Sequence, residues 1–332
     1  MPKERVLVPE ATPMSYYGQP ILKPPTWKWP IPAYLFTGGL AAGSALAAAG
    51  LRTGGARSAA RDASLLSMGA VAVSGAFLVH DLGRPSRFYN MLRVFKPTSP
   101  MSVGTWIFSA FSAATGAAVA AEVGKAAGVL PDPLAATVSR AGQVAAAVIA
   151  PALGTYTAVL IADTSVPAWK EAHRQLPPLF AASATAAGAG AVVALTTLTS
   201  GTVPAGPARM AVAGAVAELA CDEAMHRRLE SVETGDLAHP DLASPYQEGK
   251  ARTLHRAARL TTLAGVAMTA LGGLVGRRRP ALAVLGGTGL AAGSALTRFA
   301  IFEAGRASAI NPVYTAGPQR RRLGQGVAGH RP

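Results

Sequence analysis

The chain has 332 residues, of which 31 are Lys or Arg and 17 are Asp or Glu, so charged side chains make up only 14% of it. Half of the residues are apolar, which excludes an intrinsically disordered protein, because disorder requires a low apolar and a high charged content. The single cysteine, Cys221, excludes a disulfide scaffold, a zinc site built from several cysteines and an iron–sulfur cluster held by this chain.

Uncharged stretches recur along the chain, and most are long enough for a bilayer core of about 30 Å, which takes roughly 20 helical residues. They cover residues 31–50, 63–79, 103–121, 141–162, 176–208, 260–276 and 281–297. A further stretch, 210–221, is short and contains Glu218; extended to about residue 225 it approaches the width of a bilayer. These stretches lack the polar stripe of a soluble surface helix. The sequence therefore predicts an all-α polytopic membrane protein with about eight transmembrane helices, arranged as two four-helix bundles.

We expect a membrane domain at residues 31–306, with extramembrane tails at 1–30 and 307–332. An even number of spans places both tails on one side, which we call the termini face, and the first tail shows no signal peptide. This face receives 22 of the 31 Lys and Arg residues. Because cytoplasmic loops are enriched in Lys and Arg, we expect a multi-pass protein of the plasma (inner) membrane with cytoplasmic termini.

The tryptophans are distributed on one side only. All four fall near the termini face, and they are Trp27, Trp29, Trp106 and Trp169. An aromatic belt at the lipid headgroups would occupy both interfaces. A belt remains one interpretation of these residues, and the one-sided cluster suggests the other, a surface that meets a partner or a flat aromatic ligand.

The loop at residues 81–101 is rich in arginine, aromatic residues and proline. Its strings Asp81-Leu-Gly-Arg-Pro-Ser-Arg-Phe and Pro97-Thr-Ser-Pro100 resemble the loop after the second helix in the NrfD/polysulfide reductase membrane-subunit family. The first span, Trp29-Pro-Ile-Pro-Ala-Tyr-Leu-Phe-Thr-Gly-Gly, and the end of the fourth, Tyr156-Thr-Ala-Val-Leu-Ile-Ala-Asp163, carry the same resemblance. It covers roughly residues 15–300, and the segment 17–27 is similar to members associated with formate-dehydrogenase-like complexes.

The resemblance implies a subunit that holds no redox centre and is not catalytic on its own. It implies a bound quinone, expected to be menaquinone, and two partners: a ferredoxin-like four-cluster iron–sulfur subunit and a molybdopterin catalytic subunit. The residues independently indicate that the chain binds no haem, because haem b needs paired histidines on facing helices and only His80 is placed near a span. We likewise expect no metal site.

The resemblance also suggests a quinone site. Tyr34 stands where the family has a polar quinone-contacting side chain, and Tyr156 matches a tyrosine of the fourth helix. A tyrosine hydroxyl inside an apolar helix needs a partner, which a quinone carbonyl would supply. Asp163 would exchange protons with the quinone if its carboxyl were buried, and Asp81 and Arg84 complete the expected site. The alternatives are a belt tyrosine at Tyr34, packing at Tyr156 and an ion pair at Asp163.

Two further sets of residues are expected to act with this site. Trp29, Arg87, Arg93 and Trp169 would contact the iron–sulfur subunit, although arginines in this loop would also suit lipid phosphates.

Arg298 interrupts the last span, and residues 299–302 continue the apolar pattern beyond it. Charges within a membrane normally have a partner or a function. We expect a proton pathway of Arg298, Glu218, Asp222 and Glu303, with a static ion pair as the alternative.

A transporter or channel is the second class of function, since eight Gly-rich spans with a buried arginine also fit a substrate pathway. Transporters concentrate polar groups near the middle of interrupted helices, whereas here they gather at one face, around residues 27–34, 81–101 and 156–169. The net charge of +14 does not indicate nucleic-acid binding, because the basic residues lie at the membrane interface. A quinone-reactive subunit is therefore the favoured interpretation.

Overall fold

The computed structural model describes residues 20–275 and 279–328. Its long helices are α1 (Pro30–Thr53), α2 (Arg57–Asp81), α4 (Pro100–Ala126), α5 (Asp132–Ala162), α7 (Leu176–Ser200), α8 (Ala205–Glu230), α9 (Gly249–Val275) and α10 (Pro280–Ile310). The shorter ones are α3 (Arg87–Met91), α6 (Pro167–Glu171), the 3-10 helix η1 (Ser244–Gln247) and α11 (Val313–Ala328). The described residues form no strand, so the predicted all-α class is confirmed.

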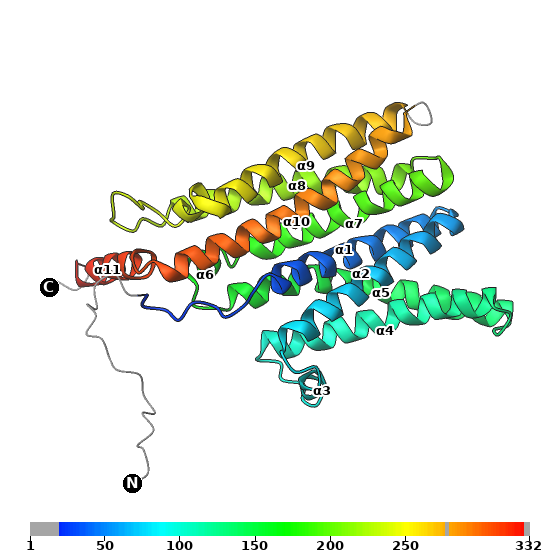
Figure 1. Ribbon diagram of the computed structural model, residues 1–332, viewed down its shortest axis with the longest axis horizontal. Helices are drawn as coiled ribbons and strands as arrows, with labels where there is room; N and C mark the ends of the chain where they lie inside the picture. Colours follow the sequence, from blue (N-terminus) through cyan, green and yellow to red (C-terminus); the bar gives the residue numbers. More distant parts are fainter. Residues whose placement is uncertain (1–19, 276–278, 329–332) are drawn as a thin grey trace, which may run out of the picture.

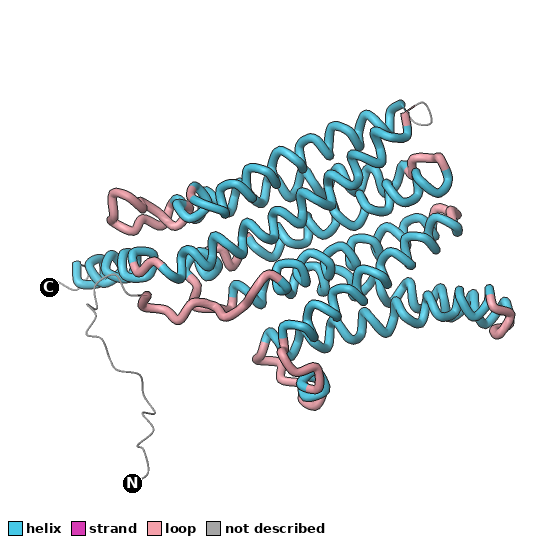
Figure 2. The backbone as a smooth tube through the Cα atoms, viewed as in Figure 1, coloured by secondary structure: helices cyan, strands magenta, loops and turns pink. Residues whose placement is uncertain are grey.

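The long helices form two four-helix bundles that lie side by side (Figure 1). Helices α1, α2, α4 and α5 make the first bundle and α7 to α10 the second, with α1 packed against α7 between them. Successive long helices run antiparallel, so α1 begins and α10 ends at the same end of the molecule (Figures 1 and 2). This end is the termini face, and it also carries α3, α6 and the loop before α9.

Seven of the long helices within the described residues are long and apolar enough to cross a membrane; α8 is the exception. Yet α8 has 26 residues, a length of about 39 Å, and packs along α7 and α9. Its low hydropathy comes from seven charged residues, of which Glu218 and Asp222 are buried against the other helices and the rest are exposed or half-buried. The helix is thus longer at both ends than the predicted segment 210–225, because a hydropathy pattern is interrupted by charged residues whereas a helix need not be.

Glycines let the two bundles approach closely. Gly43 of α1 and Gly188 of α7 lie in direct backbone contact, and a Cβ atom on either would overlap the backbone of the other helix. Small residues serve this purpose between membrane helices, where burial from water does not drive association. The contact holds the first bundle against the second.

Gly188→Ala is expected to lower the stability of the chain by about 1–3 kcal/mol, because the added methyl group forces α1 and α7 apart. The matched control is Gly116→Ala on α4, where a Cβ atom would meet nothing within 4 Å. Thermal unfolding in mild detergent, followed by circular dichroism, would compare the two variants. Equal melting temperatures would contradict the close packing.

Candidate functional site

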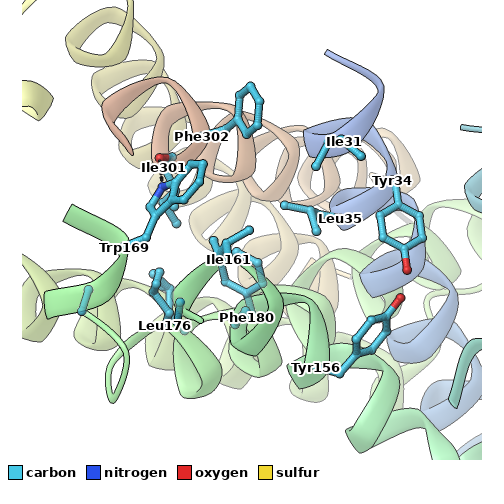
Figure 3. Packing of buried hydrophobic residues seen from close by; sticks show 14 of the residues in the cluster. Ile31, Tyr34, Leu35, Tyr156, Ile161, Trp169, Leu176, Phe180, Ile301 and Phe302 are labelled. Atoms are coloured by element: carbon cyan, nitrogen blue, oxygen red, sulfur yellow. Dashed lines mark hydrogen bonds between the residues drawn. The ribbon is translucent and has the colours of Figure 1, made fainter. Parts of the chain in front are cut away.

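Two buried tyrosines lie opposite each other inside the first bundle. Tyr34 is near the start of α1 and Tyr156 is near the end of α5, and their exposed fractions are 4% and 8%. Figure 3 shows their hydroxyl groups directed toward one another. The Tyr156 hydroxyl has no hydrogen-bond partner among the described residues. Because buried hydroxyls normally have partners, Tyr156 presents an available hydrogen-bonding group inside the bundle.

The other two helices of the bundle support this pair. Phe108 of α4 packs against Tyr34 with ring centroids 6.1 Å apart, and the Ser74 hydroxyl of α2 donates to the Tyr34 carbonyl at 3.2 Å. Gly104 of α4 lies against the face of Tyr156, where a Cβ atom would overlap the ring. The structure thus brings together the two tyrosines that the sequence selected, and α4 packs against both of their rings.

The other residues expected at this site lie nearer the water. Asp163 follows the last residue of α5 and is exposed, with no ion pair within the part of the chain described. The condition for proton exchange by Asp163, a buried carboxyl, is therefore not met, because the helix has already ended there. Asp81 is the half-buried last residue of α2, and Arg84 is exposed in the loop that follows.

Three of the four expected docking residues are on the surface. The Trp29 side chain is 59% exposed, and its ring lies edge-on to that of Phe77 with ring centroids 5.6 Å apart. Arg87 and Arg93 are exposed near α3, and Arg87 donates to the Leu82 carbonyl at 3.3 Å. Together they give the termini face an exposed aromatic ring and two cations.

Trp169 is the exception, and its predicted docking role requires correction. The side chain is fully buried; its indole nitrogen donates to the Ile301 carbonyl of α10 at 2.8 Å, and its ring stacks on Trp27. Figure 3 shows Trp169 directed into the core beside Phe302. The short helix α6 turns this face inward, so Trp169 joins α6 to α10 and does not meet a partner.

Arg298 lies inside the second bundle and is 1% exposed. Its Nη2 atom donates to the Phe180 carbonyl at 2.9 Å, and its guanidinium lies 3.5 Å from the centroid of the Phe180 ring. The other two guanidinium nitrogens, Nε and Nη1, have no hydrogen-bond partner among the described residues. The cation is thus held by a carbonyl and an aromatic face, and no carboxylate of the described residues forms an ion pair with it.

Glu218 of α8 forms a neighbouring polar group. Its Oε1 atom accepts hydrogen bonds from Ser183 at 2.8 Å and Thr297 at 2.9 Å, while Oε2 has no partner in the described structure. Ser183 also contacts Ser294 at 2.7 Å. Thr297 precedes Arg298 on α10, so Glu218 and the arginine share one buried polar region without an ion pair between them. The static ion pair given as the alternative role of Arg298 is therefore not formed with Glu218.

Glu303 does not belong to this region. Its carboxylate pairs with Lys250 at 3.0 Å and with Arg306 at 3.7 Å, near the termini end of α10. Its expected place in a proton pathway with Arg298 is therefore not supported, since two other cations neutralise it closer to the membrane surface.

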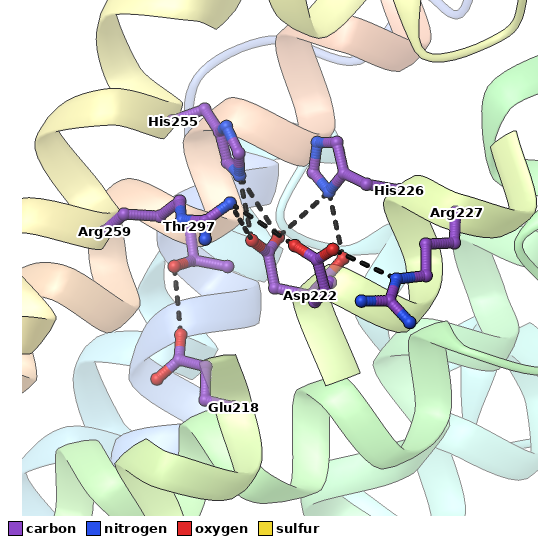
Figure 4. Close-up of polar contacts among 8 residues, drawn as sticks. Glu218, Asp222, His226, Arg227, His255, Arg259 and Thr297 are labelled. Atoms are coloured by element: carbon purple, nitrogen blue, oxygen red, sulfur yellow. Dashed lines mark hydrogen bonds and ion pairs between the residues drawn. The ribbon is translucent and has the colours of Figure 1, made fainter. Parts of the chain in front are cut away.

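Asp222 lies one helical turn after Glu218 and is 4% exposed. His255 Nε2 is 3.0 Å from its Oδ2 atom, and His226 Nδ1 is 3.5 Å from Oδ1 (Figure 4). The histidine rings stack with centroids 4.4 Å apart, beside Tyr246 of η1. Burial, and then the charge of Asp222, raise the pKa of the Tyr246 hydroxyl, so it stays protonated.

Sequence reasoning missed both histidines because it placed residues 222–259 in a loop. In the structure α8 continues to Glu230 and α9 starts at Gly249, so His226 and His255 lie on packed helices. The Asp222-x-x-x-His226 spacing was an available signal, because residues four apart share a helix face. Asp222, His226 and His255 are also a possible ligand set for a metal ion, which the sequence did not predict.

Comparison with known protein families gives a match that covers much of the chain. A family model described as polysulphide reductase, NrfD, matches residues 21–220, which is more than half of the chain. Comparison with curated proteins gives no match. The matched region contains Tyr34, Tyr156 and Glu218, and it ends before Asp222.

Proposed function

The chain belongs to the NrfD family of multi-pass, quinone-interacting membrane subunits, and on this premise we propose that it is the quinone-reactive subunit and membrane anchor of a molybdopterin oxidoreductase complex. The observation that carries the proposal is the buried Tyr156 hydroxyl, which has no partner among the described residues and faces Tyr34. The complex would be formate-dehydrogenase-like, and the quinone would be menaquinone.

The tyrosine pair has the chemistry that a quinone headgroup requires. A bound quinone takes up or releases two electrons and two protons. The Tyr156 and Tyr34 hydroxyls can donate hydrogen bonds to its carbonyl oxygens. Because both hydroxyls are neutral, this contact would place no charge in the membrane interior. Tyr156 is bounded by α4 at Gly104, so the ring has a defined position for this contact.

Gly104→Ala is expected to lower quinone-linked turnover about tenfold or more, because a Cβ atom would displace the Tyr156 ring and small displacements of a reacting group are costly. Gly116→Ala, on the same helix with open space around its Cβ position, is the matched control. Turnover would be measured with a soluble quinone analogue on the intact complex. Equal rates in both variants would argue against a role for the Tyr156 position.

The termini face is the proposed binding surface of a ferredoxin-like iron–sulfur subunit, which would exchange electrons with a molybdopterin catalytic subunit. Trp29, Arg87 and Arg93 are exposed there, and aromatic and arginine side chains are enriched at the centres of protein interfaces. Tyr34 is near the start of α1 and Tyr156 near the end of α5, so the pair lies toward the termini face and a cluster in the partner would be on the side nearer to the quinone.

An Arg87→Glu, Arg93→Glu double variant is expected to reduce the iron that copurifies with this chain at least tenfold, because reversing two interface charges repels the partner. The chain would be coexpressed with the neighbouring genes and purified in mild detergent. The control is Arg57→Glu, Arg61→Glu at the start of α2, on the opposite face. An unchanged iron content in the first variant, or an iron-free wild-type preparation, would contradict docking here.

Proton handling is proposed for the second bundle. His255 contacts Asp222 near the termini face, and Glu218, one helical turn deeper on α8, accepts a hydrogen bond from Thr297 (Figure 4). Arg298 is the next residue after Thr297 on α10. The Arg298 guanidinium lies beside Gly39 of α1, so this series ends against the first bundle. It supports a route for quinone-linked protons in which Arg298, Glu218 and Asp222 take part and Glu303 does not.

A transporter function has no comparable support. The long helices are continuous within the described residues, whereas transporter sites are commonly formed by interrupted helices. Pro151 lies inside α5 without ending it.

A further inference from the structure

A basic pocket opens at the termini face between the end of α8, η1 and the start of α9. Its volume is about 460 Å³, and its charged and aromatic lining consists of His226, Tyr246, Arg252, His255, Arg256 and Arg259. It lies beyond residue 220, outside the part of the chain that matches the NrfD family model.

The charge of this pocket favours an anion over a metal ion. Arg252 and Arg256 are exposed one turn apart on α9, and neither has an ion pair in the described part of the chain. Arg259 is the third arginine and lies 3.9 Å from Asp222 and 3.8 Å from Glu223. Asp222, a buried carboxylate next to the pocket, already contacts His255 and Arg259. A divalent cation would add to this excess of positive charge, whereas an anion would neutralise it.

Apolar side chains continue from the arginines along the same helix. Leu260 and Leu263 follow Arg256 by four and seven residues, so they lie on its face of α9. Their exposed fractions are 69% and 52%, and Leu271 and Leu274 extend the exposed stripe at 50% and 85%. A phosphate site at the membrane interface therefore leads directly into a surface for hydrocarbon chains.

We propose that the pocket binds the phosphate group of an anionic phospholipid, with the acyl chains lying along the leucine stripe of α9. Arginine is suited to phosphate because its planar guanidinium donates two parallel hydrogen bonds. Basic pockets beside membrane helices bind anionic headgroups in the same way. Free phosphate would match the arginines but would leave the leucine stripe without a ligand.

The test is native mass spectrometry of the full chain released from detergent micelles. The probes are dioleoyl-phosphatidylglycerol, dioleoyl-phosphatidylcholine with identical acyl chains, and inorganic phosphate alone. The test variant combines Arg252→Gln with Arg256→Gln. A second double variant, Arg252→Lys with Arg256→Lys, keeps the positive charge. Arg227→Gln, Arg228→Gln is the matched control, because these exposed arginines lie at the same face but outside the pocket. Circular dichroism verifies the fold of each variant.

The wild-type chain and the Arg227, Arg228 variant are expected to retain phosphatidylglycerol in preference to phosphatidylcholine. The Arg252→Gln, Arg256→Gln variant should lose this preference, with affinity reduced about tenfold or more, and the lysine variant should keep part of it. Equal retention of both lipids by the wild-type chain would overturn the proposal, as would full retention by the folded glutamine variant. Displacement of the bound lipid by inorganic phosphate at equal concentration would assign the pocket to free phosphate instead.

Discussion

Replacement of Tyr156 with phenylalanine is expected to lower quinone-linked turnover about 100-fold, because the hydroxyl is the proposed hydrogen-bond and proton donor to the quinone. The change removes one oxygen atom from a side chain that is 8% exposed and has no hydrogen-bond partner among the described residues. No protein hydrogen bond is lost, so the fold should be retained. If the hydroxyl only bound the quinone, the loss would be about 0.5–1.5 kcal/mol of affinity.

Two activities of the intact complex separate these effects. Quinone-linked activity should fall, while dye-linked activity of the molybdopterin subunit should stay unchanged, since the dye bypasses the membrane subunit. Tyr314→Phe is the matched control, because this tyrosine is 3% exposed but lies in α11, away from Tyr34. Full quinone-linked activity in both Tyr156→Phe and Tyr34→Phe would place the quinone elsewhere and leave the two tyrosines as packing residues.

Replacement of Arg298 with alanine is expected to destabilise the second bundle by about 1.5–3 kcal/mol, the worth of a hydrogen bond made by a charged group. The change leaves the Phe180 carbonyl without its donor and removes the cation that lies over the Phe180 ring. It also leaves Glu218 without a neighbouring positive charge. Quinone turnover should fall with stability if Arg298 is part of the proton route.

Arg298→Lys should be milder, because an ammonium group retains the charge and can still donate to a carbonyl. Arg306→Ala provides the control on the same helix, since the Arg306 side chain is 40% exposed and its loss should change stability by about 0.5 kcal/mol or less. Unfolding in detergent and quinone turnover would be measured on correctly inserted protein. Full stability and turnover in Arg298→Ala would show that this cation is neither a structural nor a proton-route residue.

Much of the fold was predictable from where charges are absent. A bilayer imposes a minimum length of apolar helix, so seven spans are evident in the sequence. With α8 the number of long helices is even, and both termini therefore lie on one face. The extent of α8 was not evident, because seven charged residues lower its hydropathy, including Glu218 and Asp222, which are buried in the bundle. Hydropathy records composition, whereas the direction of a polar side chain depends on the neighbouring helices.

The candidate site was predictable to a different degree. Tyr34 and Tyr156 were selected by a resemblance in the first four spans, and topology alone places them at comparable depth. Trp169 was misjudged because an aromatic side chain near an interface can turn either outward or inward, and only its contact with Ile301 decides between them. The contact of His255 with Asp222 joins residues 33 positions apart on different helices, so no local pattern shows it.

Photolabelling with an azidoquinone is the most direct test of the quinone site. The intact complex would be labelled in the membrane, with excess unlabelled quinone as competitor, and the modified peptides identified by mass spectrometry. Labels that disappear with competitor are expected at the start of α1 around Tyr34 and at the end of α5 around Tyr156. Competed labels confined to the second bundle, with α1 and α5 unmodified, would contradict a quinone site between these tyrosines.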